Sequence, residues 1–366
     1  AAALAALETP CFVFDPETIM EDHARLRAEL GTPLVVSMKA NPVLDVLVRC
    51  NEAFGDGIEI ASLGELNTTV GRMTAPRYVN TPALDAQLAA AALACRATVI
   101  ADSPRQVALV REAAAKARGP VRLALRLNAA ALIGADARRA DHFGMDPRTL
   151  WSTLDALADG GLKVVGLHVF AGSNRFAECG AALAAGMADL VSDVRRHAGA
   201  ALEFVNLGGG FPANWRDAAL DFAGYRAALD GLRRHQVAIL HEAGRAVFAR
   251  GGSFVTRVVG LKSMAGRRIA VCDGGLAQCF ALAQTESFVK RARLPVRVPM
   301  GAGEASTAPA TELVGSSCSP ADVIGRLDDA PLAEGDLLVF DQCGAYTTYS
   351  PAAFLNLRAA QRYVAS

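Results

Sequence analysis

Eight short β-type runs, separated by stretches of helical character, most constrain the fold of this 366-residue chain. Apolar residues recur at helical spacing between the runs, for example in Pro104–Ala117 and Ala181–His197. Strands that alternate with helices pair in parallel, and eight such units close into a (β/α)₈ TIM-like barrel of the α/β class. The predicted strands are Leu34–Met38, Gly57–Ile60, Arg77–Asn80, Ala97–Ala101, Val121–Leu127, Lys163–Val169, Leu202–Leu207 and Val237–His241.

The pattern changes after residue 246, where short β-like runs follow one another with Gly/Pro turns and few helical stretches. We therefore expect the barrel over residues 15–245 and a C-terminal, mostly β domain over 246–366. Segment 1–14, with the run Cys11–Phe14, is expected to join the β domain as an extra strand. The β-like runs of that domain are Ser253–Leu261, Arg268–Cys272, Val296–Val298 and Asp336–Phe340.

The composition is that of a compact enzyme. Hydrophobic residues make up 52% of the chain and charged residues 20%, which is enough for a large core. The 37 basic and 37 acidic side chains cancel, which argues against a nucleic-acid or anionic-membrane partner. No apolar run reaches the roughly 18 residues of a membrane span, and the start lacks the basic region of a signal peptide. Eight cysteines without a CxxC pair indicate reduced thiols, so we expect a soluble cytoplasmic enzyme without a metal site.

Polar or glycine residues follow each predicted barrel strand. In TIM-like barrels the site forms at the C-terminal ends of the strands, so these residues are expected to surround it. A single polar residue after a strand is often only a helix cap, but a complete ring is more than capping requires. In chain order the ring contains Lys39, Glu59 with Ser62, Asn80, Asp102, Asn128, His168, Gly208–Gly210, and Glu242 with Gly244 and Arg245.

Three features of this ring together indicate pyridoxal phosphate. Lys39 in a desolvated barrel mouth would favour the neutral, nucleophilic amine, although an ordinary ion-paired lysine would fit the same position. Gly208–Gly210 would expose backbone N–H groups that cradle a phosphate, with Gly244 and Arg245 completing the cup. Glu242 would point into the mouth and keep a pyridine nitrogen protonated.

Eight short motifs occur in the same order as in one known family. They are Ser37–Asn41, Glu59–Ser62, Gly166–Ser173, Leu207–Phe211, Glu242–Arg245, Asp273–Gly275, Cys318–Asp322 and Gly344–Tyr346. On these residues the chain resembles the fold-type III pyridoxal-phosphate decarboxylases, which include diaminopimelate, ornithine and arginine decarboxylases and are built on the alanine-racemase-like barrel. Each motif is weak alone, whereas eight in order through nearly the whole chain are a specific signal.

The resemblance implies roles for individual residues. Lys39 would bind the cofactor covalently, and Glu242 would pair with its pyridine nitrogen. The family is a head-to-tail homodimer with shared active sites, in which Cys318 would enter the partner's barrel and protonate Cα after carbon dioxide leaves. The other expected cofactor contacts are Glu59, His168, Phe170, Ser173, Gly208, Gly209, Gly210, Gly244, Arg245 and Tyr346. The expected substrate contacts are Arg126, Asp273, Ser319 and Asp322.

Three departures from the family pattern bear on these roles. Phe170 stands where a histidine usually stacks on the cofactor ring, and an aromatic face retains that function. Ser319 replaces the acidic residue that holds the distal amine of basic amino acids. Leu276–Phe280 follows Asp273–Gly275 where diaminopimelate decarboxylases carry an Arg-Pro segment for the distal carboxylate. His168 is expected to be a satisfied core histidine rather than a catalytic acid.

Three segments together resemble a subgroup that decarboxylates amino-acid groups already joined to something larger. They are His142–Met145, Phe170 and Cys318–Pro320. We expect a siderophore-type conjugate such as citryl-diaminopropionate as substrate, and hence a place in siderophore biosynthesis. Open alternatives are a carrier-protein-bound amino acid and a free diamino acid, namely diaminopimelate, ornithine, lysine or arginine. A racemase is disfavoured by the Cys318 motif, and a non-catalytic cofactor carrier by the β domain.

Overall fold

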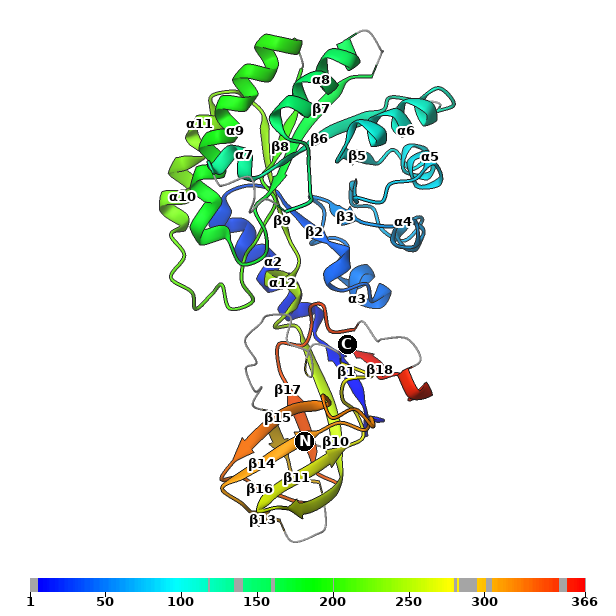
Figure 1. The fold of residues 1–366 in the computed structure, drawn as a ribbon, viewed down its shortest axis with the longest axis vertical. Coiled ribbons are helices and arrows are strands. Elements are labelled where there is room, and N and C mark those ends of the chain that lie inside the picture. Colours follow the sequence, from blue (N-terminus) through cyan, green and yellow to red (C-terminus); the bar gives the residue numbers. More distant parts are fainter. Residues whose placement is uncertain are drawn as a thin grey trace. The chain divides into compact units, whose positions relative to one another are not determined.

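The computed structural model describes residues 6–117, 119–134, 141–158, 162–199, 201–279, 282, 295–300, 305–348 and 354–365. The chain divides into two compact units (Figure 1). One is Met20–Val247, and the other combines Ala1–Ile19 with Phe248–Ser366. Each unit is described by itself, and the domain bounds expected from the sequence stay a prediction.

Eight parallel strands close into a barrel in the first unit, with each strand hydrogen-bonded to the next and β9 to β2. All eight strands expected from the sequence are confirmed, within a few residues at their ends. Their bounds are β2 Leu34–Ser37, β3 Ile58–Ile60, β4 Arg77–Asn80, β5 Thr98–Ala101, β6 Arg122–Asn128, β7 Val164–Phe170, β8 Phe204–Asn206 and β9 Ala238–Ala243.

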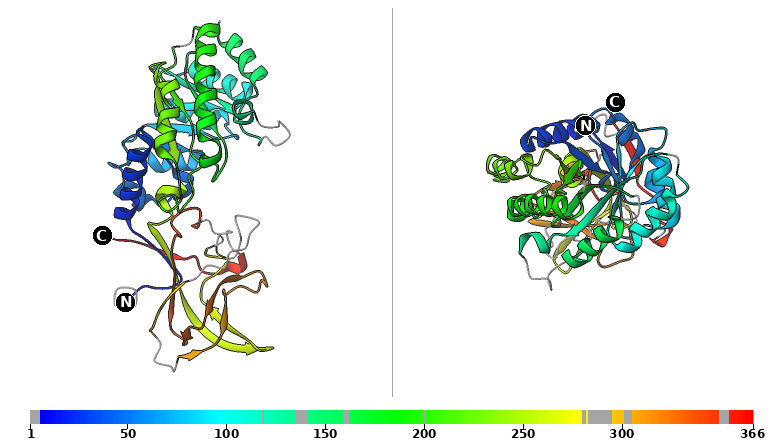
Figure 2. Two further views of the ribbon diagram at one scale, coloured as in Figure 1. Left: turned by 90° about the vertical axis from the view of Figure 1, so that its left-hand side faces the viewer. Right: turned by 90° about the horizontal axis from the view of Figure 1, so that it is seen from above.

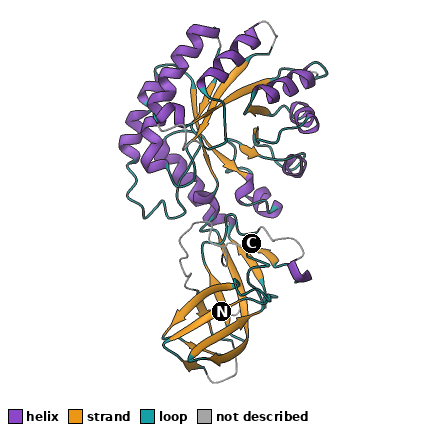
Figure 3. Cartoon of the chain, in the orientation of Figure 1, coloured by secondary structure: helices purple, strands orange, loops and turns teal. Residues whose placement is uncertain are grey.

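Helices surround the barrel strands, as Figure 3 and the right-hand view of Figure 2 show. Several begin where a side chain caps the free backbone N–H groups of the first turn; Ser62, Ser103 and Asp221 each accept such a hydrogen bond. No described helix is long and apolar enough to cross a membrane. The helices are α2 Pro16–Leu30, η1 Met38–Ala40, α3 Leu44–Arg49, α4 Leu63–Thr69, α5 Ala86–Ala94, α6 Pro104–Ala114, α7 Ala130–Ile133, α8 Pro147–Ala158, α9 Phe176–Ala198, α10 Phe222–Ala228, α11 Asp230–Arg233 and α12 Arg245–Phe248.

Apolar side chains from six strands meet inside the barrel and form its core. They are Val35, Ile100, Ala124, Val165, Phe204 and Leu240, with Tyr78 packed against them. Phe204 fills the space that Gly166 leaves on the neighbouring strand, because a β-carbon at Gly166 would collide with the Phe204 ring. The Tyr78 ring meets the same phenylalanine edge-on at 5.9 Å between centroids. The packing of the core therefore depends on the large Phe204 ring lying opposite Gly166, which has no side chain.

The second unit is mostly β, as predicted, and the N-terminal strand belongs to it. β1 (Cys11–Phe14) pairs antiparallel with β10 (Gly252–Met264) and parallel with β18 (Gln361–Val364). The main sheet has the order β12-β17-β10-β11-β14-β15. The remaining elements are β11 Arg267–Cys272, β12 Val296–Val298, β13 Ser306–Thr307, β14 Ala310–Val314, β15 Val323–Asp328, β16 Pro331–Leu332, β17 Leu337–Phe340 and η3 Phe354–Asn356.

Replacing Phe204 by alanine should empty the centre of the barrel. We expect the Phe204→Ala change to lower the free energy of unfolding by about 3–5 kcal/mol, since the cavity opposite Gly166 cannot be refilled by a neighbouring side chain. Chemical denaturation followed by circular dichroism measures this. Val48→Ala, at a side chain that is 44% exposed, is the control and should change the value by no more than about 0.5 kcal/mol. A loss that small for Phe204→Ala would contradict this account of the core.

Candidate functional site

Lys39 lies in η1, directly after β2, where its amine meets a fixed carboxylate. Its Nζ atom lies 2.5 Å from Oε2 of Glu59, the residue in the middle of β3. The hydroxyl of Ser37 donates to the same oxygen, also at 2.5 Å. The Lys39 side chain is 41% exposed, whereas that of Glu59 is 3% exposed. The buried Glu59 carboxylate therefore fixes the position of the Lys39 amine, and the exposed part of the lysine side chain leaves it accessible to an incoming group.

Asn80 joins Glu59 to two further buried side chains. Its Nδ2 donates to Oε1 of Glu59 at 3.1 Å and lies 3.5 Å from Nε2 of His168. Its Oδ1 accepts a hydrogen bond from Nη1 of Arg126 at 3.2 Å. Asn80 was expected at the barrel mouth but was assigned no contact there. Asn80 ends β4, which lies between β3 with Glu59 and β5, which Asp102 follows. This position between two strands with charged ends is the feature of the sequence that indicates its role.

Glu242 is buried at the end of β9 and is held ionised by its neighbours. Nε2 of His168 lies 3.3 Å from its Oε1, and Nδ2 of Asn206 donates to the same oxygen at 2.8 Å. Burial by itself raises the pKa of Glu242, but the interactions with His168, Lys39 and Arg126 outweigh it and hold that pKa well below its ordinary value. At neutral pH this side chain is a carboxylate pointing into the barrel. Asn206 was not singled out from the sequence.

The three glycines after β8 form a loop that admits no side chain. Oδ1 of Asn206 accepts the Gly208 N–H at 2.9 Å, which fixes the start of the loop. A β-carbon on Gly209 would collide with the carbonyl oxygen of Glu242, and Gly210 has a φ of +89° that favours glycine. Within the described part of the chain, the N–H groups of Gly209 and Gly210 donate to no protein acceptor. The loop is therefore a cradle with free donors.

These residues fit pyridoxal phosphate. An accessible amine, an ionised carboxylate and free backbone donors are the groups that its aldehyde, pyridine nitrogen and phosphate require. Two of the buried atoms that lack a hydrogen-bond partner among the described residues belong to this network, Nδ1 of His168 and Nε of Arg126. His168 is thus not the fully satisfied core histidine expected from the sequence. No group of three or more His, Cys, Asp or Glu side chains in the described ranges is arranged to hold a metal ion.

The other expected cofactor contacts of the barrel unit lie on loops at the same strand ends. Phe170 ends β7 beside the glycine loop, since a β-carbon on Gly208 would lie 3.0 Å from its ring. Ser173 is exposed on the loop after β7, and Gly244 and Arg245 follow β9. The structure therefore brings the barrel residues predicted for the site to one end of the barrel.

Arg126 was expected to contact substrate, but the structure gives it protein partners. Its guanidinium lies 3.6 Å from Oδ2 of Asp102 and 4.4 Å from the centre of the Phe143 ring. Only 5% of Arg126 is exposed. These contacts, with the hydrogen bond to Asn80, assign it to the wall of the site. A direct substrate contact stays a prediction.

Five of the predicted site residues lie in the second unit. Cys318 is exposed, and the hydroxyl oxygen of Ser319 accepts the Ala321 N–H at 3.2 Å. Tyr346 has a φ of +57°, which is uncommon for a residue with a side chain. The remaining two are Asp273 and Asp322.

Both aspartates use their carboxylates inside their own unit. Asp322 accepts the backbone N–H groups of Leu276 at 2.7 Å and Ser317 at 3.0 Å. Asp273 accepts from the hydroxyl of Thr9 at 2.5 Å and, through its other oxygen, from Thr256 at 2.7 Å. In the structure Asp273 and Asp322 thus fix neighbouring segments of their own unit. Their substrate contacts stay predictions. Phe280, in the segment that follows Asp273–Gly275, lies outside the described residues.

A histidine missed in the sequence braces β9 from its outer side. Nδ1 of His241 forms a 2.7 Å hydrogen bond with the Thr32 hydroxyl, and its Nε2 forms one of 2.6 Å with the Tyr225 hydroxyl. Burial lowers the pKa of His241 to about 3, so the ring is neutral at physiological pH. Because His241 directly precedes Glu242, this brace fixes the strand that carries the buried carboxylate.

The family model described as "Pyridoxal-dependent decarboxylase, pyridoxal binding domain" matches residues 17–249. The chain belongs to this family. The L-glutamyl-[BtrI acyl-carrier protein] decarboxylase of Niallia circulans is 28% identical over 95% of this chain and 87% of that protein. A diaminopimelate decarboxylase of Actinosynnema pretiosum subsp. auranticum is 30% identical over 92% of this chain and 79% of that protein.

Solved structures show the same fold. Diaminopimelate decarboxylase from Helicobacter pylori with L-lysine gives a TM-score of 0.82 at 18% identity, covering 100% of this chain and 93% of that one. Lysine decarboxylase from Selenomonas ruminantium gives 0.82 at 23% identity, covering 99% and 94%. The predicted family, fold class and cofactor are confirmed. This chain is a pyridoxal-phosphate-dependent amino-acid decarboxylase, a lyase.

The brace at His241 makes stability depend on pH. Because the folded pKa of about 3 lies below the ordinary value of 6.5, the unfolded chain takes up a proton between these limits that the folded chain excludes. The contribution of His241 to stability is therefore full above pH 6.5 and falls with acidification. In His241→Gln, which cannot titrate, the loss of stability between about pH 7.5 and about pH 5.5 should be smaller by about 1 kcal/mol.

Urea denaturation of the cofactor-free protein at both pH values gives this difference. His235→Gln, at a less buried histidine of the same unit, is the control and should keep the wild-type difference. An unchanged pH dependence in His241→Gln would show that the folded protein accepts a proton at this site.

Proposed function

We propose that this decarboxylase acts on an amino-acid centre that is already joined to a larger group. The observation that carries the proposal is the match, over nearly the full length of both chains, to a relative named for a glutamyl group on an acyl-carrier protein. The uncharged Ser319 adds support, since its hydroxyl oxygen caps a turn and provides no negative charge for a distal amine. Within this class we favour a carrier-tethered amino acid.

A siderophore-type conjugate such as citryl-diaminopropionate is the second candidate. It is favoured by the combination of Ser319 with Leu276–Phe280, where an arginine for a free diaminopimelate carboxylate is missing. Free ornithine, lysine, arginine and diaminopimelate are disfavoured for the same reasons.

The barrel residues divide the chemical work among them. Bound pyridoxal phosphate supplies an electron sink for the electron pair left at Cα when carbon dioxide departs. Glu242, fixed by His168 and Asn206, would keep a proton on the pyridine nitrogen of the bound cofactor. Lys39 would hold the cofactor through its amine and give it up to the substrate amine, while Glu59 positions the lysine amine. The free N–H groups of the glycine loop would bind phosphate, with Ser173, Gly244 and Arg245.

We further propose a homodimer in which each site contains Cys318 of the partner subunit as the acid that protonates Cα. In support, Cys318 is the exposed member of the eight cysteines, and a proton donor must be accessible to meet substrate. Cys95 is half-buried and the other six are buried. All eight are free thiols, which supports a cytoplasmic enzyme.

The substrate class is tested by carbon dioxide release from the cofactor-loaded enzyme. The panel is a glutamyl thioester of a carrier protein, citryl-diaminopropionate, free glutamate, and the four free diamino acids. We expect turnover of a conjugate and background release from every free amino acid. Lys39→Ala should reduce turnover to background, because no other lysine of the described residues directly follows a barrel strand. Faster turnover of a free diamino acid than of either conjugate would overturn the proposal.

The glycine cradle is tested separately by cofactor binding. Gly209→Ala should weaken binding of pyridoxal phosphate by about tenfold or more, because the new methyl group collides with the Glu242 carbonyl and moves the loop. Equilibrium titration followed by cofactor absorbance measures the affinity. Gly260→Ala, where a β-carbon meets nothing within 4 Å, is the matched control and should bind like wild type. Wild-type affinity in Gly209→Ala would remove the loop from the cofactor site.

A further inference from the structure

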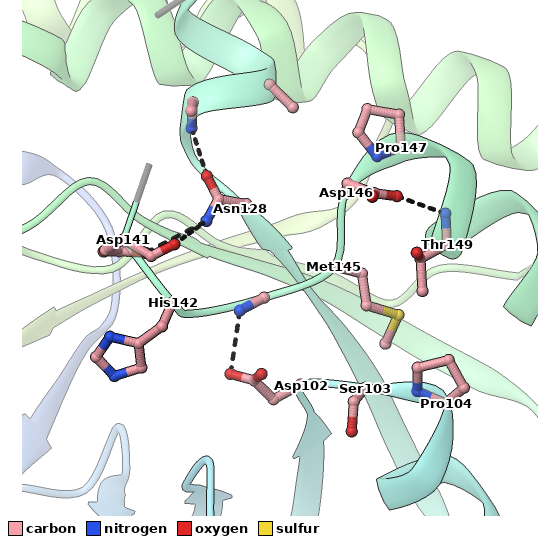
Figure 4. A pocket seen from close by; sticks show the side chains of 13 residues that line it. Asp102, Ser103, Pro104, Asn128, Asp141, His142, Met145, Asp146, Pro147 and Thr149 are labelled. Atoms are coloured by element: carbon pink, nitrogen blue, oxygen red, sulfur yellow. Dashed lines mark hydrogen bonds between the residues drawn. The ribbon is translucent and has the colours of Figure 1, made fainter. Parts of the chain in front are cut away.

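A cavity of about 700 Å³ lies beside the barrel mouth, next to the network around Lys39. Figure 4 shows side chains that line it. The cavity lies between the first turns of α6 and α8, at the ends of β5 and β6. Its volume falls in the range of roughly 300–1,000 Å³ that is typical of small-molecule sites. The lining residues that matter here are Asp102, Pro104, Ala131, His142, Met145 and Pro147.

The segment His142–Met145 builds one wall of the cavity and is fixed to β6. The Met145 N–H donates to the Arg126 carbonyl at 2.8 Å, and the Asn128 N–H donates to the Met145 carbonyl at 2.9 Å. Gly144 has a φ of +78°, and a β-carbon there would collide with the backbone of Leu127. The segment His142–Met145 therefore packs directly against β6, and His142 is exposed.

The cavity and the active-site network share Asp102. Oδ2 of Asp102 accepts the Gly144 N–H at 3.1 Å, drawn in Figure 4, and lies 3.6 Å from Arg126. Arg126 donates to Asn80, which donates to Glu59 beside the Lys39 amine. A molecule in the cavity thus touches a side chain that belongs to the wall of the active site.

The described lining of the cavity is acidic, which disfavours an anionic occupant. Three carboxylates line it, those of Asp102, Asp141 and Asp146, and none of its described lining residues is a lysine or arginine. The helix N-termini are already capped, because Ser103 accepts the Gln106 N–H and Asp146 accepts the Thr149 N–H. Proline, alanine and methionine side chains supply the apolar surface. An uncharged chain with apolar and hydrogen-bonding stretches suits this lining.

We propose that the cavity receives the uncharged, amide-bearing segment that joins the reacting amino acid to its carrier. The proposal rests on the conjugated substrate inferred above and adds where the conjugate is recognised. Recognition at this cavity distinguishes a tethered amino acid from a free one without any contact to its α-carbon. It also disfavours a polycarboxylate tail, which three carboxylates would repel.

Direct binding to the cofactor-loaded enzyme tests the cavity without turnover. The probe is pantetheine, an uncharged chain of amides and hydroxyl groups, and citrate is the anionic comparison. In Ala131→Trp an exposed alanine of the lining is replaced by a bulky indole that obstructs the cavity. Ala115→Trp, at an exposed residue just past the opposite end of α6, is the matched control. We expect calorimetry to show at least tenfold weaker pantetheine binding in Ala131→Trp and wild-type binding in Ala115→Trp.

Turnover provides the second measurement. With glutamyl-pantetheine as substrate, Ala131→Trp should raise KM at least tenfold and leave kcat within twofold, while Ala115→Trp changes neither. Equal pantetheine affinity in wild type and Ala131→Trp, no binding to wild type, or tighter binding of citrate would overturn the cavity assignment. If pantetheine binds in an Ala131-dependent way but no conjugate is decarboxylated, the conjugated substrate fails and the binding site stands.

Discussion

The burial of an ionised carboxylate inside a closed barrel is the constraint on which the rest of the site depends. A lone carboxylate in such an interior is strongly destabilising, so Glu242 must be matched by donors placed to meet it. His168 and Asn206 supply them from the two preceding strands, and the same histidine lies beside Asn80, which reaches Glu59 and Lys39. The amine, the two carboxylates and the glycine loop are therefore parts of one hydrogen-bonded assembly.

The barrel was predictable because its signal is periodic along the chain. Each strand is a short β-type run, each helix an apolar stripe, and closure follows from their alternation. Lys39, Glu242 and the triple glycine were predictable for a different reason, since their chemistry is unusual at strand ends. Neither signal depends on what lies across the barrel.

What the sequence did not reveal depends on register between strands. Asn80 and Asn206 are ordinary amides in the sequence, and they acquire roles only because parallel pairing sets them beside charged groups. His241 was overlooked because its partners, Thr32 and Tyr225, come from other elements and meet it only in the folded chain. For Asp322 the motif predicts a substrate contact, but it does not reveal the two backbone N–H groups whose hydrogen bonds its oxygens accept.

The contact between the glycine loop and β9 also fixes the distance between the loop N–H groups and the Glu242 carboxylate. The Glu242 N–H donates to the Gly208 carbonyl at 2.8 Å, and the absence of a side chain at Gly209 lets the two backbones touch. Under the proposed roles, the groups that receive the phosphate and the pyridine nitrogen are therefore joined through the main chain. The distance between the glycine loop and Glu242 is therefore fixed. A cofactor analogue with a longer or shorter phosphate arm could bind the loop or reach the Glu242 carboxylate, but not both.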